Sequence, residues 1–192
     1  STLERPKEFP EGKKCVFITG GSQGALGINR KIEESIKEII ADTSLSVVWQ
    51  VGSKHVESFQ ERLGNLPNVS IVGFVNNVYA YFQYADLIVS RAGASALAEI
   101  LAFGKPSVLL PFPHATANHQ EKNARVVEKA GAALVELDDE PNQLWAKISD
   151  LLNNDTKRGQ MAEQAKNLGM PDAADRIAKA ILKMEKYYAK NA

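Results

Sequence analysis

Six short apolar runs, each followed by a turn signal or by polar residues, constrain this chain more than any other feature. Each run is almost continuously apolar, which is typical of strands covered on both faces in a parallel sheet. Amphipathic helical stretches separate several of the runs. This alternation predicts an α/β fold with a doubly wound, mainly parallel, six-stranded Rossmann-like sheet. The runs are residues 15–19, 45–51, 69–72, 87–89, 107–110 and 133–137, and the helical stretches are residues 28–40, 56–63, 95–103 and 120–130.

The rest of the chain divides into two kinds of segment. After the sixth run, residues 142–153, 156–168 and 172–188 predict three extra C-terminal helices. We expect some of them to pack on the sheet and the last to reach another domain. Residues 1–13 are polar and contain proline, so we expect a linker or N-terminal extension there and a single domain over residues 14–192.

Composition excludes several classes of protein. The chain has 23 Lys plus Arg and 23 Asp plus Glu, so its zero net charge excludes a generically basic nucleic-acid binder. A single cysteine, Cys15, excludes an internal disulfide framework and a metal site built from several thiolates. No apolar run approaches the roughly 18 residues that a membrane span needs.

A glycine-rich segment, Gly20–Gly27, follows the first predicted strand with the sequence GGSQGALG. Glycines at such a turn let backbone amides approach a phosphate at the start of the next helix. No Gly-Lys-Ser/Thr follows, so the segment is not a P-loop. The second strand ends in Trp49-Gln50-Val51-Gly52, without the acid that holds a dinucleotide's ribose, which disfavours NAD. A tight turn with no ligand is the alternative.

A second segment with the same character follows the fourth strand, with the sequence SRAGASALAE over residues 90–99. Its small residues leave the start of the next helix open to a phosphate. Glu99 would lie one turn into that helix, where it either accepts hydrogen bonds from ribose hydroxyls or complements the helix dipole. Arg91 is either a phosphate clamp or a partner in a surface ion pair.

Two further segments follow strand ends. Asn118, His119 and Gln120 come after the fifth strand and offer neutral partners for sugar hydroxyls. A metal site is disfavoured because His114 and His119 have no third ligand nearby. The alternative for His119 is a helix N-cap or a histidine satisfied by bonds within its own loop. After the third strand, Phe74 either stacks on a base or packs in the core, and the backbone of Val75 could read a base edge.

The four segments share one edge of the predicted sheet, because each follows the carboxyl end of a strand. Ligands of doubly wound sheets bind in the crevice at that edge. A base site, two phosphate sites, an acid for a ribose and a sugar-facing loop together predict a nucleotide-sugar site.

The motifs also carry a family resemblance. GGSQGA with Asn29 behind it, GFV, RAGAS with a following AE, PFPHATANHQEKNA and EKAGAA occur in this order. Over residues 14–183 the chain resembles the C-terminal half of the UDP-N-acetylglucosamine transferases of peptidoglycan synthesis, in glycosyltransferase family 28. The resemblance implies one lobe of a GT-B fold that binds UDP-N-acetylglucosamine, with no cofactor and no metal.

The same resemblance implies roles for individual residues. The first glycine-rich turn would lie near the diphosphate and sugar, Phe74 and Val75 would hold the uracil, and Glu99 would bind the ribose. Arg91 would lie near the phosphates, and the start of the helix at residue 94 would supply amides to them. His119 and Gln120 would contact the N-acetylglucosamine. The full set of implied donor-binding residues is Gly21, Ser22, Gln23, Phe74, Val75, Arg91, Ala94, Ser95, Ala96, Leu97, Glu99, His119 and Gln120.

The chain departs from the family pattern in three respects. Leu26 stands where the family often has Arg, and Ala96 where it usually has Thr. The family's N-terminal domain, which carries the acceptor site and the expected catalytic base, has no counterpart here, so we expect no catalytic residue in this chain. With such a domain, the resemblance implies an inverting transfer to a lipid-linked muramoyl-pentapeptide in cell-wall synthesis. It also implies a cytoplasmic location, peripheral at the inner face of the plasma membrane.

Two alternatives remain open at this point. One is the donor-binding part of another UDP-sugar enzyme, either a lipid glycosyltransferase or an epimerase. The other is a non-catalytic subunit that partners a separate membrane protein.

Overall fold

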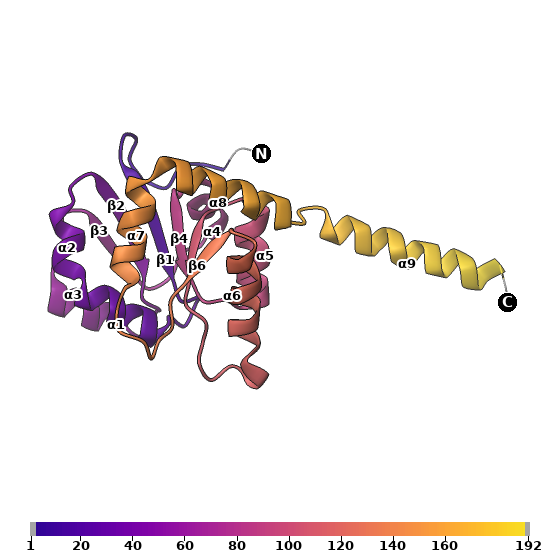
Figure 1. Ribbon diagram of the computed structural model, residues 1–192, viewed down its shortest axis with the longest axis horizontal. Helices are drawn as coiled ribbons and strands as arrows, with labels where there is room; N and C mark the ends of the chain where they lie inside the picture. The colour runs from indigo at the N-terminus through magenta and orange to yellow at the C-terminus, as the bar shows by residue number, and fades with distance from the viewer. Residues whose placement is uncertain (1–2, 191–192) are drawn as a thin grey trace.

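The computed structural model describes residues 3–190, with side chains to residue 184. Residues 1–2 of the predicted extension and 191–192 of the predicted domain lie outside these residues. The fold is a parallel sheet with the strand order β3-β2-β1-β4-β5-β6 (Figure 1). The strands are β1 (Lys14–Thr19), β2 (Leu45–Gln50), β3 (Val69–Val72), β4 (Leu87–Ser90), β5 (Ser107–Leu109) and β6 (Ala133–Val135). The predicted doubly wound α/β sheet is confirmed.

Helices cover both faces of the sheet. They are α1 (Leu26–Glu34), α2 (Ile36–Ala41), α3 (Val56–Leu63), α4 (Val78–Tyr84), α5 (Ala94–Ala102), α6 (His119–Lys129), α7 (Leu144–Asn153), α8 (Asp155–Leu168) and α9 (Ala173–Lys190), with a 3-10 turn η1 (Thr116–Asn118). One core cluster joins the sheet to α1, α2, α3 and α7, and a second joins its other face to α4, α5 and α6. This two-sided covering accounts for the nearly continuous apolar runs.

Successive side chains of a strand enter opposite clusters. Val16 and Ile18 of β1 pack in the first cluster, whereas Cys15 and Phe17 pack in the second. All four are at most 1% exposed. The alternation of side-chain direction along a strand therefore serves two cores rather than one core and solvent.

The predicted helices differ from the structure in two places. The predicted helix over residues 28–40 is divided at Ser35, whose hydroxyl donates to the carbonyl of Lys31 at 3.3 Å and which separates α1 from α2. Helix α4 was not predicted. Its sequence, VYAYFQY, is rich in aromatic residues that favour strands, and the burial of Ala80 and Phe82 against the sheet accounts for the helix.

The N-terminal segment, predicted as a linker or extension, packs on the sheet over its described residues. Phe9 is fully buried in the second cluster and meets the Tyr81 ring edge-on, with centroids 5.5 Å apart. The Tyr84 hydroxyl donates to the carbonyl of Leu3 at 2.9 Å. Phe9 therefore anchors this otherwise exposed segment in the core.

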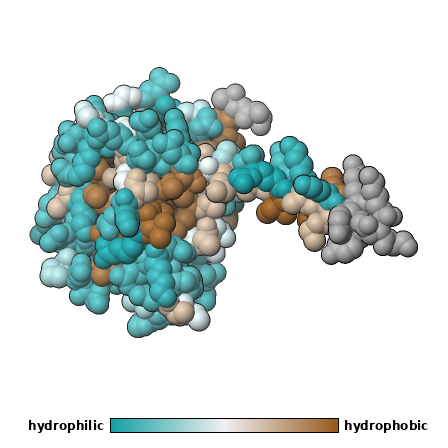
Figure 2. Space-filling view, turned by 45° about the vertical axis from the view of Figure 1, so that its right-hand side comes forward, coloured by the Kyte–Doolittle hydropathy of each residue, from teal (hydrophilic) through white to brown (hydrophobic). Residues whose placement is uncertain are grey.

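The C-terminal helices differ in how they pack. Helix α7 contacts α1 and the strands β4 and β5, and α8 contacts α5 and α7. Helix α9 extends away from the sheet (Figure 1), and Figure 2 shows hydrophobic surface on this projecting segment. The side chains of Ile177, Ile181 and Met184 are each about 60% exposed. None of the helices in the described residues is long and apolar enough to cross a membrane.

Candidate functional site

A cavity opens at the point where the strand order reverses, beside the carboxyl ends of β1 and β4. The order of the sheet leads outward from β1 to β3 on one side and from β4 to β6 on the other. The cavity has a volume of about 330 Å³. Such a reversal is where doubly wound folds bind their ligands. The cavity is lined by Thr19, Gly20, Gly21, Ser22, Gln50, Phe74, Val75, Asn76, Val78, Phe82, Ser90, Arg91, Gly93, Ala96, Glu99 and Gln120.

The first glycine-rich turn forms one wall of the cavity. The Gly21 amide donates to the Thr19 hydroxyl at 3.0 Å, and the Gln50 side chain donates to the Gly21 carbonyl at 2.8 Å. Behind the turn, the buried Asn29 donates to the carbonyl of Val51 and accepts from Trp49 Nε1. These bonds hold Gly21 and Ser22 at the cavity, with Asn29 supporting the turn from inside the core.

The start of α5 forms the opposite wall. The first intrahelical bond runs from the Leu97 amide to the Gly93 carbonyl at 3.0 Å. The amides of Ala94, Ser95 and Ala96 therefore have no acceptor within the helix. Leu97 is also among the predicted donor-binding residues, but its amide is hydrogen-bonded within the helix and its side chain is buried in the core. It is not available to a phosphate.

An exposed aromatic side chain and a carboxylate mark the next part of the cavity. Phe74 follows β3 and is 55% exposed, so the alternative that it packs in the core is wrong. Val75 beside it is buried, with its backbone at the cavity. Glu99 lies one turn into α5 and accepts a hydrogen bond of 3.4 Å from Tyr79. A stacking surface and a carboxylate acceptor thus lie in one cavity.

The start of α6 contributes one of its two predicted residues to the cavity. Gln120 lines the cavity and its Oε1 accepts from the Phe112 amide at 3.0 Å. His119 lies outside the cavity, with Nδ1 2.7 Å from the Thr116 carbonyl oxygen, and two left-handed residues, Ala117 (φ 51°) and Asn118 (φ 53°), precede it. The alternative of a histidine bonded within its own loop describes His119.

Arg91 lines the cavity but is engaged by the protein. Its two terminal nitrogens form a bidentate pair with the Asp138 carboxylate, each at 2.8 Å. It also donates to the carbonyls of Leu110 and Pro111 at 3.0 and 3.1 Å. The Arg91 and Asp138 side chains are 13% and 14% exposed. Arg91 therefore forms an ion pair, as the alternative predicted, but the pair is partly buried rather than on the surface.

Several predicted residues lie away from the cavity. Gln23 is exposed, and its carbonyl lies against Gly52. Ala94 and Ser95 are exposed at the start of α5, and neither lines the cavity. Leu26, the first departure from the family pattern, is 68% exposed and lies in a different hollow. Ala96, the second departure, lies in the cavity itself.

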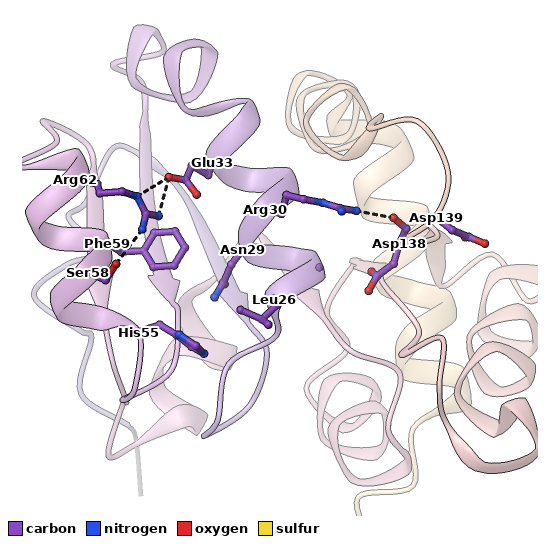
Figure 3. Close-up of a pocket in the computed structure, with 11 residues that line it drawn as sticks. Leu26, Asn29, Arg30, Glu33, His55, Ser58, Phe59, Arg62, Asp138 and Asp139 are labelled. Carbon is purple, nitrogen blue, oxygen red and sulfur yellow. Dashed lines mark hydrogen bonds and ion pairs between the residues drawn. The ribbon is translucent and has the colours of Figure 1, made fainter.

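That different hollow lies between α1, α3 and the segment after β6 (Figure 3). It is larger, at about 650 Å³. Its cations are already paired, since Arg62 bonds Glu33 at 2.8 Å and Arg30 donates to the Asp138 carbonyl at 3.0 Å. Because both arginines are engaged by other groups of the protein, we place the candidate site in the smaller cavity.

Sequence reasoning missed some residues of the cavity. Thr19, Gln50 and Ser90 are polar, at most 6% exposed, and each is the last residue of its strand. A polar residue at the end of an apolar run was a signal that could have found them. Among the side chains that the structure describes, no group of three or more His, Cys, Asp or Glu could hold a metal ion.

Comparison with known proteins agrees with this geometry. Residues 15–177 match the family model of the glycosyltransferase family 28 C-terminal domain. The chain belongs to this family. The match of the family model begins within β1 and ends within α9, so it includes every element that lines the cavity.

Individual members of the family are also similar to the chain. It is 37% identical over 183 residues to a Salinibacter ruber protein named UDP-N-acetylglucosamine--N-acetylmuramyl-(pentapeptide) pyrophosphoryl-undecaprenol N-acetylglucosamine transferase. That alignment covers 95% of this chain and 50% of the relative. A protein of the same name from Acetivibrio thermocellus is 37% identical, with 94% and 50% covered. The chain thus spans about half the length of these relatives.

The solved structure of MurG from Acinetobacter baumannii superimposes with a TM-score of 0.80 at 26% identity. The superposition covers 91% of this chain and 51% of that one. The family 28 fold is therefore shared over nearly the whole chain.

Proposed function

We propose that this chain is the donor-binding half of an inverting glycosyltransferase whose donor is UDP-N-acetylglucosamine. One observation carries the proposal: a single cavity at the sheet reversal gathers the glycine-rich turn, the start of α5, Phe74, Glu99 and Gln120. Each offers what a different part of a nucleotide sugar needs. Relatives of the chain carry the name of a transferase that uses this donor.

The donor would lie across the cavity from base to sugar. The uracil stacks on Phe74, and its edge meets the backbone of Val75. The ribose hydroxyls donate to the Glu99 carboxylate. The diphosphate meets the free amides at the start of α5, where the helix dipole also favours negative charge. Ser22 and Gln120 then face the N-acetylglucosamine.

The transfer would be a single displacement. The acceptor hydroxyl oxygen attacks the anomeric carbon of N-acetylglucosamine while the bond from that carbon to the UDP oxygen breaks. A base on the other half of the enzyme takes the acceptor proton. The electron pair of the broken bond stays with UDP, whose added charge the α5 amides stabilise.

The acceptor and the base would be supplied by an N-terminal domain, covalently joined or separate. The acceptor would be a lipid-linked muramoyl-pentapeptide, as in the name of the relatives. Transfer to a lipid carrier requires the complete enzyme to work at a membrane surface, and we propose the inner face of the plasma membrane. The chain alone would bind donor without transferring sugar.

Calorimetry with UDP and UDP-N-acetylglucosamine tests the proposal. We expect saturable binding of both ligands. Glu99→Ala should weaken the affinity for each about 30-fold, because it removes the charged carboxylate that accepts hydrogen bonds from the ribose hydroxyls. Glu57→Ala is the matched control, since Glu57 is an exposed glutamate in the first turn of α3, away from the cavity. Absence of UDP binding, or equal effects of the two substitutions, would contradict the proposal.

A further inference from the structure

Asp138 lies at the meeting point of three segments around the cavity, although the cavity lining does not include it. Its carboxylate holds Arg91 of the β4–α5 turn. It also lies against the first turn of α1, where a Cβ added to Gly27 would be 2.1 Å from Asp138 Oδ2. Figure 3 shows Asp138 beside Arg30, which donates to its backbone carbonyl. The Asp138 side chain is therefore closely packed and held in one position.

The segment that carries Asp138 is fixed on both sides. Before it, the Glu136 carboxylate is 1% exposed and bonds Lys31 at 2.8 Å and Lys147 at 2.6 Å. After it, Lys31 donates to the Glu140 carbonyl at 2.9 Å. Two ion pairs to the buried Glu136 carboxylate thus attach this loop to α1 and α7. They fix the backbone position from which the Asp138 side chain extends.

A chain of hydrogen bonds leads from Asp138 to the sugar end of the cavity. Asp138 orients Arg91, and Arg91 grips the carbonyls of Leu110 and Pro111. The next amide, that of Phe112, donates to Gln120 Oε1 at 3.0 Å. Since the oxygen of the Gln120 amide is used, its nitrogen is the group left for a ligand, and this nitrogen lies beside Gly93 at the cavity wall.

We propose that Asp138 is a positioning residue for recognition of the donor's sugar. By holding Arg91, it fixes the backbone at residues 110–112 and presents the Gln120 amide N–H to a sugar hydroxyl oxygen. Arg91, in turn, acts on the ligand through this loop rather than as a phosphate clamp. The inference rests on the proposed function and deepens it, because it concerns the sugar of the same donor site.

The test is the ratio of affinities for UDP-N-acetylglucosamine and UDP, measured by calorimetry on the full chain. Asp138→Asn should lower UDP-N-acetylglucosamine affinity about 10-fold and leave UDP affinity within about 2-fold, because it breaks the bidentate pair. A general loss of structure would weaken both ligands together. Asp139→Asn is the matched control, as Asp139 is the neighbouring exposed carboxylate, and it should leave the ratio unchanged.

Two further variants keep the test decisive. Asp138→Glu retains the charge and should lower the ratio less, by about 3-fold. In a Gln120→Ala background, Asp138→Asn should change the ratio no further, since both act through one amide. An unchanged ratio in Asp138→Asn, or independent losses in the double variant, overturns this inference alone. Failure of the unsubstituted chain to bind UDP overturns the proposed function instead.

Discussion

The β1–α1 and β4–α5 turns both consist largely of small residues, yet their surroundings in the structure differ. In the β1–α1 turn, a Cβ on Gly24 would be 1.9 Å from the Val51 carbonyl oxygen, and one on Gly27 would overlap the Asp138 carboxylate. In the β4–α5 turn, a Cβ on Gly93 would meet nothing closer than Gln120 Nε2 at 3.9 Å. At Gly24 and Gly27 the first turn is filled by the protein, while Gly21 stays open at the cavity, and the second turn is open at Gly93.

The difference shows that glycine serves two purposes at strand-to-helix turns. In the first turn it lets backbone approach backbone, and the start of α1 already faces the carboxylate of Asp138. The ion pair of Asp138 with Arg91 thus already occupies the space beside that helix start. In the second turn, glycine leaves the α5 amides uncovered. We therefore assign the phosphates to α5 and the support of the cavity wall to the first turn.

The largest expected effect comes from adding one methyl group to the first turn. Gly24 has φ +75°, and its Cβ would overlap backbone atoms that cannot move aside. We expect Gly24→Ala to lower the free energy of unfolding in urea by about 4 kcal/mol. Gly93→Ala is the control in the second turn, where φ is −66°, and it should change stability by less than about 1 kcal/mol. Equal losses would remove the contrast.

The second largest loss of stability should come from a substitution in the loop that carries Asp138. Glu136→Gln leaves Lys31 with a charge that is 2% exposed and lacks a carboxylate partner. We expect a loss of about 3 kcal/mol in urea unfolding. Glu128→Gln is a useful control, because Glu128 also forms an ion pair, with Arg125, but its side chain is 32% exposed. Its loss should be under about 1 kcal/mol.

The same ion pair predicts how stability depends on pH. Burial works to raise the pKa of Glu136, but hydrogen bonds from Lys147, Lys31 and the Gln143 amide outweigh it and hold the pKa below its ordinary value of 4.5. The stability from this group is therefore complete above pH 4.5 and is lost as pH falls through the lowered pKa. The difference between the unsubstituted chain and Glu136→Gln should shrink below that pH. A difference that grows on acidification would contradict the pairing.

The contrast between the turns also explains what could be predicted from sequence. Strand ends are visible because an apolar run stops at a glycine or a polar residue, so the sheet and the edge that bears the cavity were predictable. Gln120, Glu99 and Phe74 follow such ends and were found by that rule. The rule treats both turns alike, because it does not reveal that the Asp138 carboxylate lies at the start of α1 and not at the start of α5.

What could not be predicted depends on contacts between distant segments. Arg91 and Asp138 are 47 positions apart, and no local pattern indicates that they pair. His119 and Gln120 are neighbours in α6, yet only Gln120 lines the cavity, because successive residues of a helix point in different directions. Helix α4 likewise forms through burial of Phe82, against the strand preference of its aromatic residues.

The smallest expected effect is a gain in affinity at the open turn. Ala96 lines the cavity at the start of α5, and a hydroxyl there would add a donor toward a bound phosphate. We expect Ala96→Thr to raise UDP affinity about 5-fold, a typical gain for one added hydrogen bond. Ala98→Thr is the control, because Ala98 is exposed on the same helix and lines the apolar groove beside α6 instead. If Ala96→Thr leaves UDP affinity unchanged while Glu99→Ala abolishes it, the phosphates do not lie at this helix start, and the assignment of the two turns has to be reversed.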